Sequence, residues 1–194
     1  MSRREKGRLV RCAGCALPPE LCFCAALRAI PARTRVVVLM QASERTKPTN
    51  TGRLVPRLLE GAEVRLRGAP DAPLAVADLA DPARRLLLLD PAGPPLDADD
   101  PRPVTLLVPD GTWRQARRIV TREVWHAGAT RVRLPAAAPT RYRLRNSGAP
   151  ARLATLEAVA RALGILEGPA AQAHLEEAFD LMVERTLRLR GALR

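Results

Sequence analysis

VTLLVPDGTWRQARRIVTREV, residues 104–124, is the stretch of this sequence that decides the fold. Its first five residues, 104–108, are a β-branched and aliphatic run that predicts a buried strand. The Pro-Asp-Gly sequence that follows predicts a tight turn. From Trp113 onward, apolar residues recur at helical spacing on one face. The stretch therefore predicts a unit of strand, turn and helix.

Similar strand signals occur on both sides of this unit. RVVVLMQ (residues 35–41) and RRLLLLD (residues 84–90) are continuous apolar runs, and RVRL (residues 131–134) is a shorter one. Two helices are expected at the end of the chain, over residues 153–166 and from 169 to about 190. Strands that are apolar on both faces and alternate with helices predict an α/β fold, with a mostly parallel sheet flanked by helices. Ligands bind such sheets at the C-terminal ends of the strands.

The turn Asp110-Gly111-Thr112-Trp113 lies at one of these strand ends. It brings a carboxylate, a hydroxyl and a large aromatic face together, which favours a ligand site. The alternative is structural: Asp110 caps the following helix, Gly111 permits the turn and Trp113 packs in the core. Likewise, Glu44 and Asn50-Thr51 can be ordinary loop and capping residues, and the RYRLRNS loop can be a solvated basic hairpin. The residues alone leave both interpretations open.

The four cysteines occur within thirteen residues, in the pattern C-x2-C-x6-C-x-C. They are Cys12, Cys15, Cys22 and Cys24. Four thiolates in two close pairs can surround one Zn²⁺ tetrahedrally, and such a site is structural because no coordination position stays open. A redox pair and an iron–sulfur cluster are the alternatives. We expect residues 1–30 to form a zinc-binding knuckle with a basic arm, and residues 31–194 the catalytic α/β domain.

The composition indicates a polyanionic partner. The 194 residues include 32 Lys and Arg against 20 Asp and Glu, a formal net charge of +12, and nearly all the basic residues are arginine. Arginine suits phosphates and base stacking, although a solvated surface encoded by an arginine-biased genome is the alternative. No apolar run approaches the length that spans a bilayer, and the N-terminus lacks a signal-peptide core. We expect a cytoplasmic protein with no membrane partner and no evident obligate protein partner.

Five motifs occur in an order that resembles the DTW-domain family of tRNA-uridine aminocarboxypropyltransferases. They are the cysteine pattern, PTNTGRL after the first strand, DGTW after a later strand, RYRLR, and LATLEAVARAL. The resemblance runs from Cys12 to about Leu163. It implies a SPOUT-like fold whose C-terminal part is threaded as a trefoil knot, which sequence patterning alone does not predict because true knots are very rare.

The resemblance also implies a reaction. N3 of a uridine in tRNA attacks the Cγ methylene of the 3-amino-3-carboxypropyl (acp) arm of S-adenosylmethionine (SAM), and 5′-methylthioadenosine is released. Asp110 is the candidate base for the N3 proton if burial raises its pKa toward neutrality, or else it binds the amino group of the cofactor. The expected cofactor-binding residues are Asp110, Gly111, Thr112, Trp113, Arg143, Leu144, Arg145, Asn146, Thr155 and Glu157. The expected RNA-binding residues are Glu44, Asn50, Thr51, Arg53, Arg114 and Arg117.

Two adjacent positions depart from the family pattern, because Gln41 and Ala42 replace a frequent His-Pro pair ahead of Glu44. We expect that imidazole to be supportive rather than essential. Two alternative functions stay open: a SAM-dependent SPOUT-like RNA methyltransferase, and a non-catalytic zinc-containing RNA-binding protein. The sequence leaves open which uridine is modified, whether other RNAs are used, and the oligomeric state.

Overall fold

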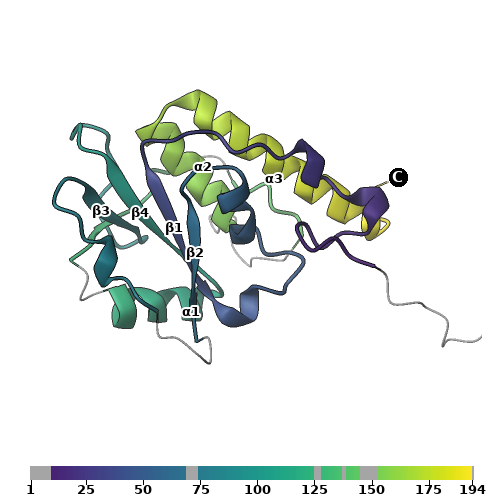
Figure 1. Cartoon of the computed structure of the whole chain (residues 1–194), viewed down its shortest axis with the longest axis horizontal. Coiled ribbons are helices and arrows are strands. Elements are labelled where there is room, and N and C mark those ends of the chain that lie inside the picture. Colours follow the sequence, from purple (N-terminus) through teal and green to yellow (C-terminus); the bar gives the residue numbers. More distant parts are fainter. Residues whose placement is uncertain (1–9, 69–73, 125–127, 137–138, 145–152, 194) are drawn as a thin grey trace, which may run out of the picture.

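The computed structural model describes residues 10–68, 74–124, 128–136, 139–144 and 153–193. Five strands form one parallel sheet in the order β2-β1-β4-β3-β5 (Figure 1). They are β1 (Arg35–Gln41), β2 (Glu63–Arg67), β3 (Arg85–Leu89), β4 (Val104–Asp110) and β5 (Thr130–Val132). The predicted α/β class, with a parallel sheet flanked by helices, is confirmed.

The sequence predicted the inner strands and missed an edge strand. β1 and β4 are central, and continuous apolar runs suit strands buried on both faces. β2 reads EVRLR, alternates charged and apolar residues, and forms one edge of the sheet. An alternating edge strand of this kind is not found by a search for continuous apolar runs.

Helices cover both faces of the sheet. They are α1 (Trp113–Arg118), which continues as the π-helical η6 (Ile119–Val124), α2 (Thr155–Leu166) and α3 (Pro169–Leu189). Short 3-10 turns lie between the strands and before β1: η1 (Pro19–Leu21), η2 (Cys24–Ala26), η3 (Ala42–Glu44), η4 (Gly52–Arg57) and η5 (Ala77–Leu79). α2 packs against α3, and α1 lies on the other side of the sheet (Figure 1). No helix in the described ranges is long and apolar enough to cross a membrane.

The apolar core has two parts, one on each face of the sheet. Val36, Val38 and Met40 of β1 belong to the larger cluster, with the buried side chains of α2 and α3. The alternate residues of β1, Val37 and Leu39, belong to the smaller cluster with η5 and η6. The period-two alternation of a strand explains this division.

The connections that follow β1 and β4 run to opposite edges of the sheet, so a topological switch point lies between these two strands. From β1 the chain passes to β2 at one edge, and from β4 it passes over β3 to β5 at the other edge. A crevice outside the carboxyl ends of two such strands is where open α/β sheets bind ligands. Met40 of β1 is paired with Asp110 of β4 at this point. The fold therefore positions Asp110 where a ligand is expected.

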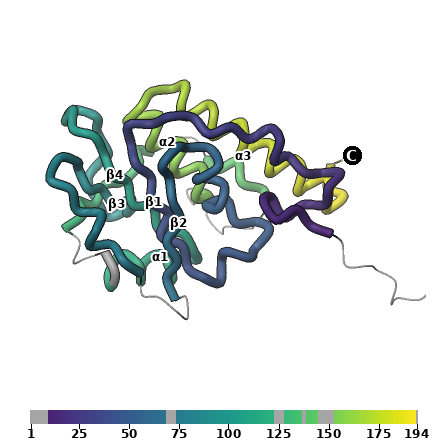
Figure 2. The backbone as a smooth tube through the Cα atoms, viewed as in Figure 1, coloured from purple at the N-terminus to yellow at the C-terminus, as the bar shows by residue number. Residues whose placement is uncertain are grey.

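The N-terminal segment lies along α3 (Figures 1 and 2). Cys15, Leu17 and Phe23 belong to the same apolar cluster as α2 and α3. The ring of His174 on α3 hydrogen-bonds the carbonyl of Arg28 at 2.8 Å. Residues 10–30 thus share the core of the sheet domain, and the predicted domain division at residue 30 stays a prediction. The predicted trefoil knot also stays a prediction, since residues 145–152, in the C-terminal part, lie outside the described residues.

We expect Leu163→Ala to lower the free energy of unfolding by about 2–5 kcal/mol, because Leu163 of α2 is fully buried in the larger cluster and truncation leaves a cavity. Val10→Ala is the control, since Val10 is 76% exposed, and its effect should stay within about 0.5 kcal/mol. Chemical denaturation measures both. Equal stability of the two variants would contradict the assignment of Leu163 to the core.

Candidate functional site at the carboxyl ends of β1 and β4

Asp110 is the centre of the site. It ends β4, is only 6% exposed, and accepts hydrogen bonds on both carboxylate oxygens. Asn50 Nδ2 donates to Oδ2 at 2.5 Å, and Thr155 Oγ1 donates to Oδ1 at 2.5 Å. A buried charge needs such partners. The loop after β1 and the first residue of α2 therefore meet at one carboxylate.

The TNTG segment, residues 49–52, fits closely between Asp110 and α2. Thr51 Oγ1 accepts a hydrogen bond from Leu156 N at 3.1 Å, so it satisfies a free N–H in the first turn of α2. At Gly52 an added Cβ would lie 2.8 Å from Asp110 Oδ2. Glycine at this position lets the loop backbone approach the carboxylate.

Glu157 braces the loop that carries RYRLR. Its carboxylate accepts hydrogen bonds from Thr140 Oγ1 at 2.5 Å, Arg141 N at 2.8 Å and Ala154 N at 2.9 Å. The hydroxyl of Tyr142 donates to the carbonyl of Thr49. These contacts hold residues 140–142 against both α2 and the TNTG segment, so Glu157 positions this loop.

The structure contradicts part of the structural interpretation of the DGTW turn. The N-cap of α1 is Thr112, whose hydroxyl accepts a hydrogen bond from Gln115 N at 3.4 Å. Gln115 Oε1 in turn accepts from Thr112 N at 2.8 Å, which completes a capping box. Trp113 is 51% exposed. Asp110 is therefore not the cap of α1, and Trp113 is not a core residue.

A row of arginines follows Trp113. Arg114, Arg117, Arg118 and Arg122 are exposed, and we call them the arginine face. In the described part of the chain none of these four side chains has an acidic partner. Some other exposed arginines are paired, as in Arg141 with Asp180 at 3.0 Å and Arg102 with Asp100 at 2.6 Å. The arginine face is therefore an electropositive surface beside the site.

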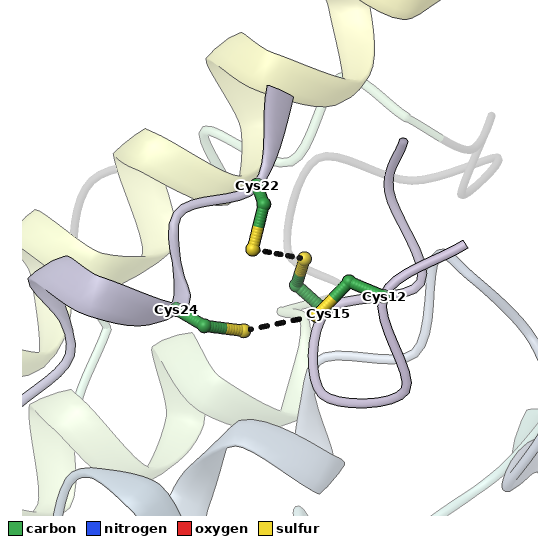
Figure 3. A group of neighbouring side chains, drawn as sticks. All are labelled: Cys12, Cys15, Cys22 and Cys24. Atoms are coloured by element: carbon green, nitrogen blue, oxygen red, sulfur yellow. Dashed lines mark hydrogen bonds between the residues drawn. The ribbon is translucent and has the colours of Figure 1, made fainter. Parts of the chain in front are cut away.

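The four cysteines form a compact cluster that can hold a metal ion (Figure 3). Their Sγ atoms all lie within 4.8 Å of one another, with 3.5 Å between Cys12 and Cys24 and 3.7 Å between Cys15 and Cys22. A tetrahedral zinc site with Zn–S bonds of about 2.3 Å has sulfur atoms about 3.8 Å apart. The cluster thus fits zinc in both donor set and spacing.

The thiol pKa values in the cluster differ in direction. Backbone hydrogen bonds of Cys15 and Gly14 lower the pKa of Cys12 to about 6. Burial raises the pKa of Cys15 to about 12 and also raises the pKa of Cys24. A bound cation is what would let all four sulfurs be thiolates at once.

Comparison with known proteins decides the family, because the DTW domain model matches residues 9–187. This chain belongs to the DTW domain family. The solved structure of the SAM-dependent rRNA:acp-transferase Tsr3 from Vulcanisaeta distributa has the same fold. The match covers 81% of this chain and 79% of that one, with 21% sequence identity and a TM-score of 0.51. The SPOUT relationship inferred from the sequence stays a prediction.

The other predicted RNA-binding residues of this DTW domain lie near the site in different settings. Glu44 is 1% exposed and pairs with Lys47. Arg53 directs its guanidinium toward the cysteine cluster, where it donates to the carbonyl of Cys15. Gln41, at the end of β1, accepts from Arg67 at 3.2 Å. The roles predicted for Glu44 and Arg53 in RNA binding stay predictions.

The predicted cofactor residues are partly described. Arg143 is exposed, and Leu144 is 5% exposed with its carbonyl accepting from Arg190 at 2.8 Å. Arg145 and Asn146 lie outside the described residues. Sequence reasoning missed Gly52 and Thr140. The sequence signal for Gly52 was a glycine directly after Thr-Asn-Thr, whereas no sequence pattern singles out Thr140.

In this DTW domain we expect about one zinc ion per chain by native mass spectrometry and elemental analysis. Cys22→Ser should reduce the bound zinc well below that and lower the unfolding midpoint by about 5–10 °C, because the metal contributes to folding. Ala13→Ser is the matched control, since Ala13 is an exposed neighbour without a thiol. Full zinc content in Cys22→Ser would contradict the site, and iron with sulfide would indicate a cluster instead.

Proposed function

We propose that this protein transfers the acp group from SAM to N3 of a uridine in tRNA and releases 5′-methylthioadenosine. The observation that carries the proposal is the buried carboxylate of Asp110, held at the switch point by Asn50 and Thr155. Membership of the DTW domain family supports it. The fold shared with an rRNA:acp-transferase supports the same chemistry on RNA.

The reaction forms the N3–Cγ bond and breaks the Cγ–S and N3–H bonds. The lone pair of uridine N3 attacks Cγ of the arm, the Cγ–S bond breaks, and its electron pair neutralises the sulfonium to give the thioether. The N3 proton leaves to a base. Three carbons on the sulfonium are electrophilic, so the product depends on which carbon faces the uridine. Holding one carbon in line is an orientation task that a rigid site performs well.

Asp110 is suited to fix the arm. Two neutral donors already contact its oxygens, an arrangement that suits a carboxylate holding a cation. We therefore assign the α-ammonium group of the arm to Asp110, and the alternative assignment is that Asp110 receives the N3 proton. Its burial also removes water from the place where the sulfonium charge is neutralised.

The RNA side of the site is the arginine face with Trp113. An exposed indole can stack on an unpaired base. The four guanidinium groups of the arginine face, which have no acidic partner among the described residues, can contact phosphates. N3 of a paired uridine is buried in the base pair, so the target nucleotide must be unpaired or flipped out. Phosphate contacts and base stacking would suit rRNA as well as tRNA, and the motif resemblance favours tRNA.

We expect Asp110→Asn to reduce acp transfer about 100-fold or more, measured by nucleoside mass analysis of tRNA incubated with protein and SAM. Asp99→Asn is the control, because Asp99 is exposed and lies in the loop before β4. A gain of methyl mass with the unmodified protein would move the assignment to a methyltransferase. No product on any RNA and no SAM binding would leave a zinc-containing RNA-binding protein.

Calorimetry with SAM separates the two roles of Asp110. Loss of a charge-assisted hydrogen bond to the α-ammonium group should weaken SAM binding by Asp110→Asn about 10-fold to 100-fold. SAM affinity equal to that of the unmodified protein, together with the loss of turnover, would instead assign the N3 proton to Asp110.

We expect the double variant Arg117→Ala with Arg118→Ala to weaken tRNA binding several-fold and to reduce the slope of log affinity against log salt by about two. SAM affinity should not change. Arg102→Ala with Arg188→Ala is the matched control, since both arginines are exposed and paired with acidic residues elsewhere. An unchanged salt slope in the first variant would exclude the arginine face from the RNA interface.

A further inference from the structure

Two arginines of η4 connect the cysteine cluster to the loop of the candidate site. Arg57 Nη1 donates to Cys24 Sγ at 2.8 Å. Arg53 Nη2 donates to the carbonyl of Cys15 and, at 3.2 Å, to that of Pro48. Residues i and i+4 of one short helical segment therefore contact two different cysteines of the cluster.

The contact with Arg57 is close enough to restrict the neighbouring residue. A Cβ added at Gly14 would lie 2.6 Å from Arg57 Nη1 and 2.8 Å from Cys24 Sγ. The guanidinium group thus occupies the space that any other side chain at position 14 would need. The loop between Cys12 and Cys15 is shaped to receive Arg57.

The charges are complementary when the cluster is loaded. A centre of four thiolates and one divalent cation is doubly negative, and Arg53 and Arg57 bring two positive charges to it. Nε of Arg53 is buried and has no hydrogen-bond partner among the described residues. A buried cation is stable only with a negative charge near it, and the loaded cluster would supply that charge.

The other side of this segment leads to Asp110. The backbone N–H of Arg53 donates to Asn50 Oδ1 at 3.0 Å. The amide group of the same Asn50 donates to Asp110 Oδ2 at 2.5 Å. A continuous chain of hydrogen bonds therefore runs from the backbone of a cysteine ligand, through Arg53 and Asn50, to the carboxylate of the site.

We propose that the metal-loaded cysteine cluster clamps residues 50–57 through Arg53 and Arg57, and so keeps Asn50 in contact with Asp110. The two arginines are positioning residues, and the cluster acts on the site in addition to stabilising the fold. The consequence for SAM binding rests on the proposed function, whereas the clamp itself does not.

The first test measures zinc release into a chromophoric chelator. Arg57→Gln should release zinc about 10-fold faster than the unmodified protein, because the thiolate of Cys24 loses its cationic partner. Arg57→Lys, which keeps the charge, should fall between the two. Arg45→Gln is the matched control, since Arg45 is exposed. A release rate in Arg57→Gln equal to that of the control would overturn the proposal.

The second test measures hydrogen exchange of residues 50–57 in the zinc-loaded proteins. Exchange in this segment should rise in Arg57→Gln and stay unchanged in Arg45→Gln, while exchange in α2 stays slow in both and shows that the domain is folded. Slow exchange of residues 50–57 in Arg57→Gln would overturn the clamp even if zinc release were faster.

SAM calorimetry on the same variants separates this inference from the proposed function. Weaker SAM binding by Arg57→Gln than by Arg45→Gln supports a clamp that acts on the site. SAM binding by neither variant nor the unmodified protein would defeat the proposed function, and the zinc and exchange results would still decide the clamp. Equal SAM affinity in Arg57→Gln, Arg45→Gln and the unmodified protein would overturn the proposal that the clamp acts on the site.

Discussion

Burying the charge of Asp110 requires donors, and these come from two segments that are far apart in the sequence. Asn50 follows β1 and Thr155 begins α2, so satisfying one carboxylate fixes the loop after β1 and the start of α2 relative to β4. The rest of the site depends on this constraint. Thr51 then caps α2, Gly52 fits against the carboxylate, and Glu157 holds the loop that carries Tyr142.

Most of the fold could be predicted because burial on both faces leaves a strong trace in the sequence. The runs of β1, β3 and β4 and the helical spacing of α2 and α3 gave nearly the observed bounds. β2 was missed because an edge strand tolerates alternating charges, and Glu63 pairs with both Arg65 and Arg35. The strand β4 also extends through Pro109 to Asp110, which the turn signal placed outside it.

From the sequence, the residues of the site could be predicted to lie close together, but their individual contacts could not. The order of motifs brought Asp110, Asn50 and Thr155 together, since loops at the carboxyl ends of parallel strands meet at one edge. The order of motifs does not predict which side chain hydrogen-bonds which partner, because that depends on the direction in which each side chain points. Thr51 precedes η4, but its hydroxyl makes no cap hydrogen bond there and accepts one from the first turn of α2. Arg53, a residue suited to RNA by its type, points toward Cys15.

The side chain of Arg53 connects the N-terminal segment to the loop of the candidate site, because it donates to the carbonyl of Cys15. A zinc knuckle that only stabilised a basic arm would need no contact with the residues around Asp110. Here Cys15, Leu17 and Phe23 lie in the main core, and Arg53 and Arg57 meet the cluster from the segment that holds Asn50. Two buried or half-buried cations facing four sulfurs are costly unless the sulfurs are negative. The negative charge of a loaded cluster would therefore stabilise Arg53 and Arg57, and the same short helical segment holds Asn50 in place through the backbone of Arg53.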